Sequence, residues 1–72
     1  MTHEELISNG YRWDDWDDTY RLGKYRFGHQ EIEDEIGFQI ISVAEYDNYH
    51  GIEIRPIKTI EDFMHFVSFY LR

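Results

Sequence analysis

Aromatic side chains are the feature of this sequence that most limits how it can fold. The chain has two Trp, six Tyr and five Phe among 72 residues, and it has no cysteine. A domain this small buries only about 60% of the surface of its unfolded chain, and no disulfide can add stability. Because each ring can bury about 150–250 Å², we expect a single domain, residues 1–72, whose core is built mainly from rings.

The composition also excludes several classes of function. Without cysteine there is no thiolate nucleophile and no Cys-containing zinc site. No apolar run approaches the about 18 residues of a membrane span. The first five residues are acidic where a signal peptide is basic, so we expect a cytoplasmic protein.

No motif for catalysis or metal binding occurs. The four histidines are far apart in the sequence, and the serines have no glycine elbow. A calcium loop that began at Asp14 would need a glycine after Asp18 and an acidic residue at its twelfth position. No glycine follows Asp18, and the twelfth residue is Tyr25. We therefore expect no catalytic residue, no metal and no cofactor.

Two helices are predicted, one near each end of the chain. Thr2 and Glu5 have the spacing of a capping box, which predicts a short helix over about residues 3–9. Thr59 is the expected N-cap of a second helix with acidic residues in its first turn. The apolar stripe of that helix consists of Ile60, Phe63, Met64, Val67, Tyr70 and Leu71.

Between the helices, residues 11–19 indicate a turn-rich loop. In residues 20–27 apolar and polar side chains alternate, and the phase of the alternation shifts by one residue at Gly23. A two-residue hairpin turn and a glycine bulge both explain such a slip. The hairpin would place Arg21 opposite Arg26, which is unfavourable. One bulged strand is therefore favoured.

Residues 38–46 are apolar on both faces, which predicts a central strand covered on both sides. Residues 28–37 indicate a connection or an edge, and residues 47–51 a hairpin loop. Residues 52–55 indicate a strand that Pro56 either closes or puts on an edge of the sheet. The fold predicted is α+β: a small three-stranded antiparallel sheet flanked by a short N-terminal helix and a C-terminal helix, αβββα.

The net charge of -8 is concentrated in clusters. Four carboxylates surround Trp16, and a second group follows at residues 31–35, where alternate glutamates would share one face of an extended chain. Glu45 and Asp47 add a third patch. Such a surface either keeps a small protein soluble or presents carboxylates and flanking rings to a partner groove that is built for phosphates.

In composition the chain resembles the small acidic inhibitors, often phage-encoded, that imitate nucleic acid to block nucleases and defence proteins. The resemblance implies an anti-CRISPR-like decoy that occupies the basic groove of a nucleic-acid-handling protein. Tyr25 and Tyr49 are further candidate anchors for such a contact. The candidate contact residues are Asp14, Asp15, Asp17, Asp18, Glu31, Glu33, Asp34, Glu35, Trp13 and Trp16.

The chain has one group of basic residues, which lies next to the first acidic cluster. Direct nucleic-acid binding by these bases is disfavoured because the acids around them repel phosphates. We expect them instead to pair with the aspartate loop of the same chain. They are Arg12, Arg21, Lys24 and Arg26.

The last helix is apolar around most of its circumference, because Phe66 and Phe69 lie off its stripe. A small domain that is short of core gains stability by dimerising. We expect a homodimer, or burial against a partner, through Phe66, Phe69 and Tyr70, whereas a monomer with both helices on one sheet face is the simpler arrangement. The alternative function is an assembly module that associates through this helix.

Overall fold

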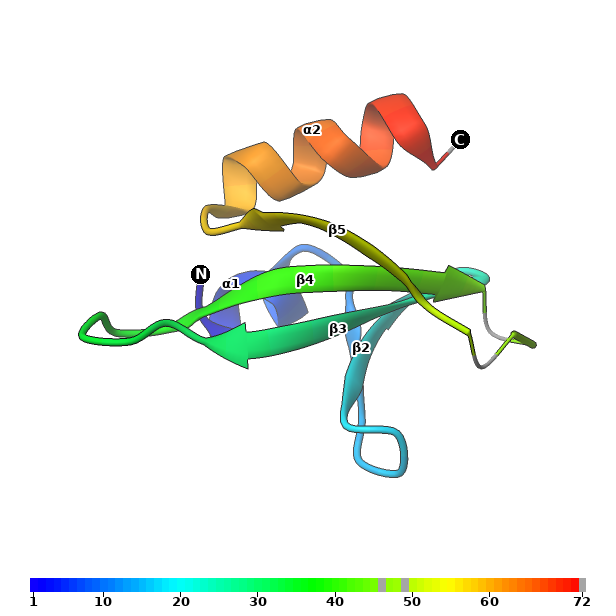
Figure 1. Cartoon of the computed structure of the whole chain (residues 1–72), viewed down its shortest axis with the longest axis horizontal. Coiled ribbons are helices and arrows are strands. Elements are labelled where there is room, and N and C mark those ends of the chain that lie inside the picture. The colour runs from blue at the N-terminus through cyan, green and yellow to red at the C-terminus, as the bar shows by residue number, and fades with distance from the viewer. Residues whose placement is uncertain (46, 49, 72) are drawn as a thin grey trace.

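The computed structural model describes residues 1–45, 47, 48 and 50–71. In these residues it has two helices and a five-stranded antiparallel sheet, whose strands lie side by side in chain order (Figure 1). The α+β class is confirmed, but the prediction of three strands was wrong. Tyr46 and Tyr49 lie outside the described residues. The elements are α1 (His3–Ser8), β1 (Arg12–Asp14), β2 (Thr19–Leu22), β3 (Tyr25–Glu31), β4 (Phe38–Glu45), β5 (Ile52–Ile57) and α2 (Ile60–Tyr70).

The two unexpected strands come from the segments before residue 28. β1 forms within the predicted loop, and residues 20–27 are a hairpin rather than one bulged strand. Gly23, with φ of 57°, takes the first position of the two-residue turn, where a positive φ favours glycine. Arg21 does lie opposite Arg26. The prediction failed because it counted the repulsion between these arginines without the carboxylates that reach them.

Both helices pack on the same face of the sheet. Tyr20 and Phe27 are cross-strand partners on β2 and β3. The His3 ring of α1 lies 5.7 Å from the ring of Tyr20, and the Phe63 ring of α2 lies 4.9 Å from that of Phe27. One core therefore joins both helices to the middle of the sheet. Its buried members are Met1, Leu6, Tyr11, Tyr20, Phe27, Ile40, Val43 and Phe63.

β4 was predicted to be the central strand; it is an interior strand that pairs with β3 on one side and β5 on the other, and β3 is the central strand of the five. β4 is not covered on both faces. A register shift between Ile40 and Ser42 changes the phase of the strand, so Ile40 and Val43 both lie in the core although they are three residues apart. The prediction had placed them on opposite faces.

The predicted helix caps are confirmed. The Thr2 hydroxyl accepts a hydrogen bond from the Glu5 backbone N–H at 3.3 Å, while the Glu5 carboxylate accepts one from the Thr2 N–H at 2.9 Å. The Thr59 hydroxyl accepts from the Asp62 N–H at 3.2 Å. In α2, however, Met64 is 47% and Tyr70 76% exposed, so their assignment to the apolar stripe was wrong. Phe66, which was predicted to lie off the stripe, packs against the core.

Candidate functional site

The loop between β1 and β2 is folded around the side chain of Asp14. Its carboxylate accepts hydrogen bonds from the backbone N–H of Trp16 at 2.9 Å and of Asp17 at 3.4 Å. The Asp14 carbonyl accepts from the Asp18 N–H at 2.9 Å. An aspartate that bonds to the backbone two and three residues later is a common way to fix a turn. The loop therefore has a defined shape and presents its tip in one orientation.

Asp14 also has a shifted pKa. Partial burial raises the pKa of Asp14. The N–H groups of Trp16 and Asp17 and the guanidinium of Arg21 lower it by more than that, so the pKa of Asp14 lies below its ordinary value. The Arg21 Nη1 atom lies 3.1 Å from Asp14 Oδ2. This carboxylate is thus held in its charged form by the turn that it organises.

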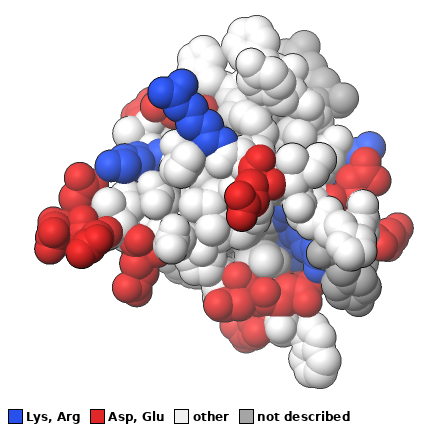
Figure 2. Space-filling model, in the orientation of Figure 1, with Lys and Arg blue, Asp and Glu red and all other residues white. Residues whose placement is uncertain are grey.

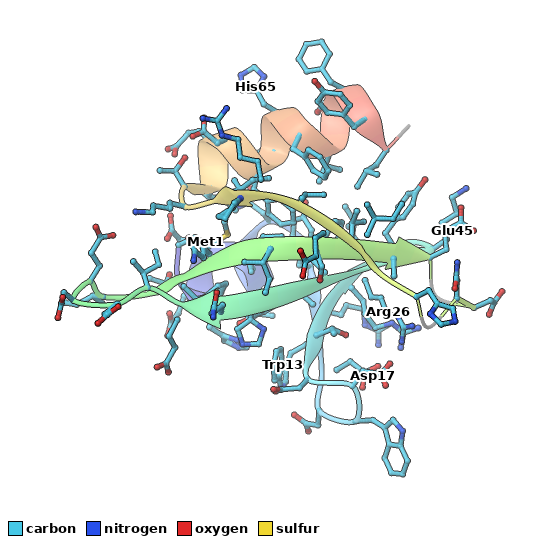
Figure 3. The ribbon with its side chains drawn as sticks, in the orientation of Figure 1. Met1, Trp13, Asp17, Arg26, Glu45 and His65 are labelled. Atoms are coloured by element: carbon cyan, nitrogen blue, oxygen red, sulfur yellow. The ribbon has the colours of Figure 1, made fainter. Side chains whose placement is uncertain are left out.

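Arg26 links the same loop to the loop between β4 and β5. Its side chain is 9% exposed, and its Nη1 atom lies 3.0 Å from Asp17 Oδ2. Its Nη2 atom donates to the Asn48 carbonyl at 2.7 Å. Asp17 and Arg26 point toward one another in Figure 3. The expectation that the bases pair with the aspartate loop is confirmed for Arg21 and Arg26.

The other two bases behave differently from Arg21 and Arg26. Lys24 lies 3.9 Å from Glu45 rather than against the loop. Arg12 is exposed and makes no ion pair with any residue that the structure describes. The expected pairing therefore involves two of the four bases.

The residues left exposed at the tip of this loop are Asp15, Trp16 and Asp18. The side chain of Trp16 is 90% exposed, and neither Asp15 nor Asp18 makes an ion pair with a described residue. We call these three residues the hairpin tip. Asp18 has φ of 58°, a left-handed conformation that Asp and Asn tolerate better than most residues.

Trp13, the other predicted anchor, lies in a different environment. Its ring is 4.8 Å from that of Tyr20, 5.5 Å from His29 and 6.2 Å from His3. Trp13 is half-buried and therefore supports the packing of α1 on the sheet, whereas Trp16 projects from it. Tyr25 is likewise half-buried beside the core.

A hollow of about 720 Å³ lies beside the hairpin tip. The side chains around it include both tryptophans and the guanidinium groups of Arg12 and Arg21. Because Asp14 and Asp15 also line it, the hollow carries both signs of charge. It offers room beside Trp16 for a side chain of a binding partner.

The second acidic cluster lies at the turn between β3 and β4. Glu31 ends β3, and Asp34 turns the chain with φ of 64°, so the glutamates of this segment do not form the extended row considered from the sequence. Glu35 lies 3.9 Å from Lys58. Ile36 is 97% exposed among these acids, and the sequence reasoning missed it. A lone apolar residue inside an acidic loop was the available signal.

The carboxylates do not form one continuous surface. Figure 2 shows them in separate groups, at the turn between β3 and β4, at the hairpin tip and near the loop between β4 and β5. The area over α2 is largely uncharged in the same view (Figure 2). The acidic residues therefore lie in several separate groups, and on α2 they are confined to Glu61 and Asp62 in its first turn.

A shallow groove of about 570 Å³ runs between β5 and the outer side of α2. It contains the residues that the sequence assigned to an oligomer interface, Phe66, Phe69 and Tyr70. Ile54 and Pro56 form part of its β5 side. The structure thus joins the exposed rings of α2 to apolar residues of the last strand.

The described residues contain no group of three or more His, Asp or Glu side chains that could hold a metal ion. Neither helix of the described chain has the length and apolar character needed to cross a membrane. Comparison with protein-family models, curated proteins and solved structures found no match. The assignment of function therefore depends on the geometry of the hairpin tip and of the groove.

Proposed function

We propose that the protein is an acidic inhibitor or decoy that binds the basic groove of a nucleic-acid-handling protein, with the hairpin tip as its main contact. The observation that carries the proposal is the 90% exposure of Trp16 in a loop fixed at its base by Asp14. A cytoplasmic location is part of the proposal, because partners of this kind work there. The proposal retains the resemblance to small nucleic-acid mimics.

An exposed tryptophan on a rigid loop supports a binding role. Tryptophan is enriched among the few residues that contribute most of the free energy of protein association. The bond from the Trp16 backbone N–H to Asp14 fixes the backbone of the loop, so less backbone entropy is lost on binding. In a groove that receives bases, the indole of Trp16 can take the place of a stacked base.

The free carboxylates of the tip support the choice of a basic partner. Asp15 and Asp18 flank Trp16 and have no ion pair among the described residues, whereas Asp14 and Asp17 are held by arginines of the same chain. The net charge of -8 attracts a cationic groove at long range and speeds the encounter. The proposal thus assigns contact with the partner to Asp15, Trp16 and Asp18, and assigns the shape of the loop to Asp14 and Asp17.

The test uses the full chain as bait for proteins that bind DNA or RNA. The captured protein should be released by a nucleic-acid oligonucleotide, because the two compete for one groove, and by NaCl at about 1 M, where the Debye length is about 3 Å. Trp16→Ala should weaken capture by about 30-fold or more. Asp15→Asn with Asp18→Asn should weaken capture mainly at low salt.

The matched control removes two carboxylates elsewhere. Glu53→Gln with Glu61→Gln changes the net charge by the same amount on β5 and α2, where both residues are exposed. It should retain most of the binding. A partner that resists the oligonucleotide and stays bound after the changes to Trp16, Asp15 and Asp18 would contradict the proposal.

A further inference from the structure

We infer that the groove between β5 and α2 binds a second copy of this chain, so that the protein is a twofold symmetric dimer whose acidic loops face outward. The inference does not depend on the proposed partner. It rests on the two faces of α2, on the distribution of charge along the chain, and on a pair of opposite charges in the groove.

The helix α2 has two different apolar faces. The inner face packs on the core and consists of Ile60, Phe63, Val67 and Leu71, together with the half-buried Phe66, which also borders the outer face. The outer face carries two stacked pairs of rings at i and i+4: His65 with Phe69 at 5.8 Å and Phe66 with Tyr70 at 5.4 Å between centroids. His65 points away from the sheet in Figure 3. A helix on the surface of a monomer normally has a polar outer face, so this outer face is suited to a further contact.

The exposed rings are large enough to form much of an interface. Phe69 is 75% and Tyr70 76% exposed. At about 150–250 Å² for a whole aromatic side chain, these two rings alone expose about 300 Å² per copy. A stable interface commonly buries about 800 Å² on each partner. Pro56 and the half-buried side chains of Phe66 and Ile54 extend the same apolar face.

The charge distribution favours a second copy as the occupant. Residues 1–51 contain twelve acidic and four basic side chains, whereas residues 52–72 contain three of each. Two copies of this protein therefore repel one another through most of the chain but not through the segment that forms β5 and α2. Because like charges near an interface cost several kilocalories per mole, the neutral segment is the place where the copies can meet.

The groove also contains a pair of charges that fits twofold symmetry. Arg55 on β5 and Asp62 on α2 both line it, and neither makes an ion pair with a described residue. In a twofold interface a contact from residue i to residue j is repeated from j to i. Arg55 of each copy can then reach Asp62 of the other, which gives two equivalent ion pairs beside the rings.

Pro56 indicates that the contact is made through side chains. β5 is the last strand of the sheet, and its outer edge is the usual place for an added strand. Pro56 has no N–H, so β5 lacks one backbone donor within its length. The second copy is therefore expected to pack its own α2 across the groove rather than extend the sheet.

The oligomeric state in solution tests the inference. Sedimentation of the full chain at about 1 to 200 µM should show a dimer that persists at about 1 M NaCl, because ring burial is screened less than surface charge. Phe69→Ser and Tyr70→Ser should each raise the dissociation constant by about 30-fold or more. Ile36→Ser removes an apolar side chain that is 97% exposed and lies outside the groove, and this variant should leave the dimer intact.

A charge-exchange experiment tests the symmetry without relying on the rings. Arg55→Asp alone and Asp62→Arg alone should each weaken self-association, and an equal mixture of the two variants should form the mixed dimer in preference to either parent. A monomer at all concentrations, a dimer that survives both ring changes, or a mixture that shows no preference would overturn the inference. None of these outcomes bears on capture of a partner by the hairpin tip, so the two proposals fail separately.

Discussion

Asp14 combines three tasks in one side chain: it closes a turn, binds Arg21 and keeps its charge. Its lowered pKa means that the folded state holds this proton less tightly than the unfolded chain does. The stabilisation is therefore present above the ordinary aspartate pKa of about 3.9 and is lost as the pH falls through the lower folded value.

We expect Asp14→Asn to destabilise the protein at neutral pH and to have a smaller effect once the pH has fallen below the lowered pKa of Asp14, because the charge it removes is then absent from both proteins. The measurement is urea unfolding of both proteins across the acidic range. Asp15→Asn is the control, since Asp15 makes no ion pair with a described residue. A difference between wild type and Asp14→Asn that stays constant with pH would contradict the role given to the charge.

Gly28 is a position of the sheet where an added side chain would meet another atom. It lies opposite Ser42, and a Cβ at residue 28 would collide with the Ser42 hydroxyl oxygen. We expect Gly28→Ala to destabilise the fold by about 1–3 kcal/mol, the usual range for overpacking. Ser42→Ala in the same chain should recover most of that loss, because it removes the colliding atom. A double-mutant cycle by urea unfolding measures this coupling, and additive effects would show that the contact is not the cause.

At the scale of elements, the helices could be predicted from sequence because their signals are local. Thr2 with Glu5, and Thr59 with the acids after it, mark helix starts through bonds within one turn. The hairpin of β2 and β3 could not be predicted in the same way. Its facing arginines lie against Asp14 and Asp17, which the short strand β1 and the loop after it bring to Arg21 and Arg26.

The two tryptophans of the candidate site also differ in a way that depends on the fold and not on local sequence. The sequence placed Trp13 and Trp16 together in an acidic loop, but it does not show that one ring is half-buried beside Tyr20 while the other is exposed. That difference follows from the short strand β1, which fixes Trp13 on the core face. The acidic clusters were visible from composition, whereas their internal ion pairs required the fold.

The Asp17–Arg26 pair should contribute strongly to the hairpin. Asp17→Ala leaves a nearly buried guanidinium opposite Arg21 without its carboxylate, so we expect a loss of about 1–3 kcal/mol in the free energy of unfolding. Asp18→Ala, one residue later and without an ion pair to a described residue, is not a clean control because of its left-handed backbone. Asp15→Ala is the better one and should change stability by less than about 0.5 kcal/mol. Equal effects of Asp17→Ala and Asp15→Ala on urea unfolding would contradict this role.

On the scale of the whole molecule, the surplus of negative charge sets how stability responds to salt. The principal extents are 33, 27 and 23 Å, so at about 0.01 M ionic strength, with a Debye length of about 30 Å, most carboxylates repel one another. We expect the melting temperature to rise by a few degrees, about 1 kcal/mol of added stability, when NaCl reaches about 0.15 M. Asp15→Asn with Asp18→Asn should show a smaller rise. A melting temperature that falls with salt would mean that the ion pairs outweigh the repulsion.

Arg21 and Arg26, which face each other on β2 and β3, reduce the number of carboxylates that are open to a cation. Asp14 and Asp17 serve as internal counter-ions for Arg21 and Arg26. A cation that competed for both carboxylates would remove part of this charge compensation between neighbouring strands, and we expect the hairpin to lose stability. A cationic ligand is therefore expected to bind the exposed carboxylates of Asp15 and Asp18 at a lower energetic cost than the inner pair.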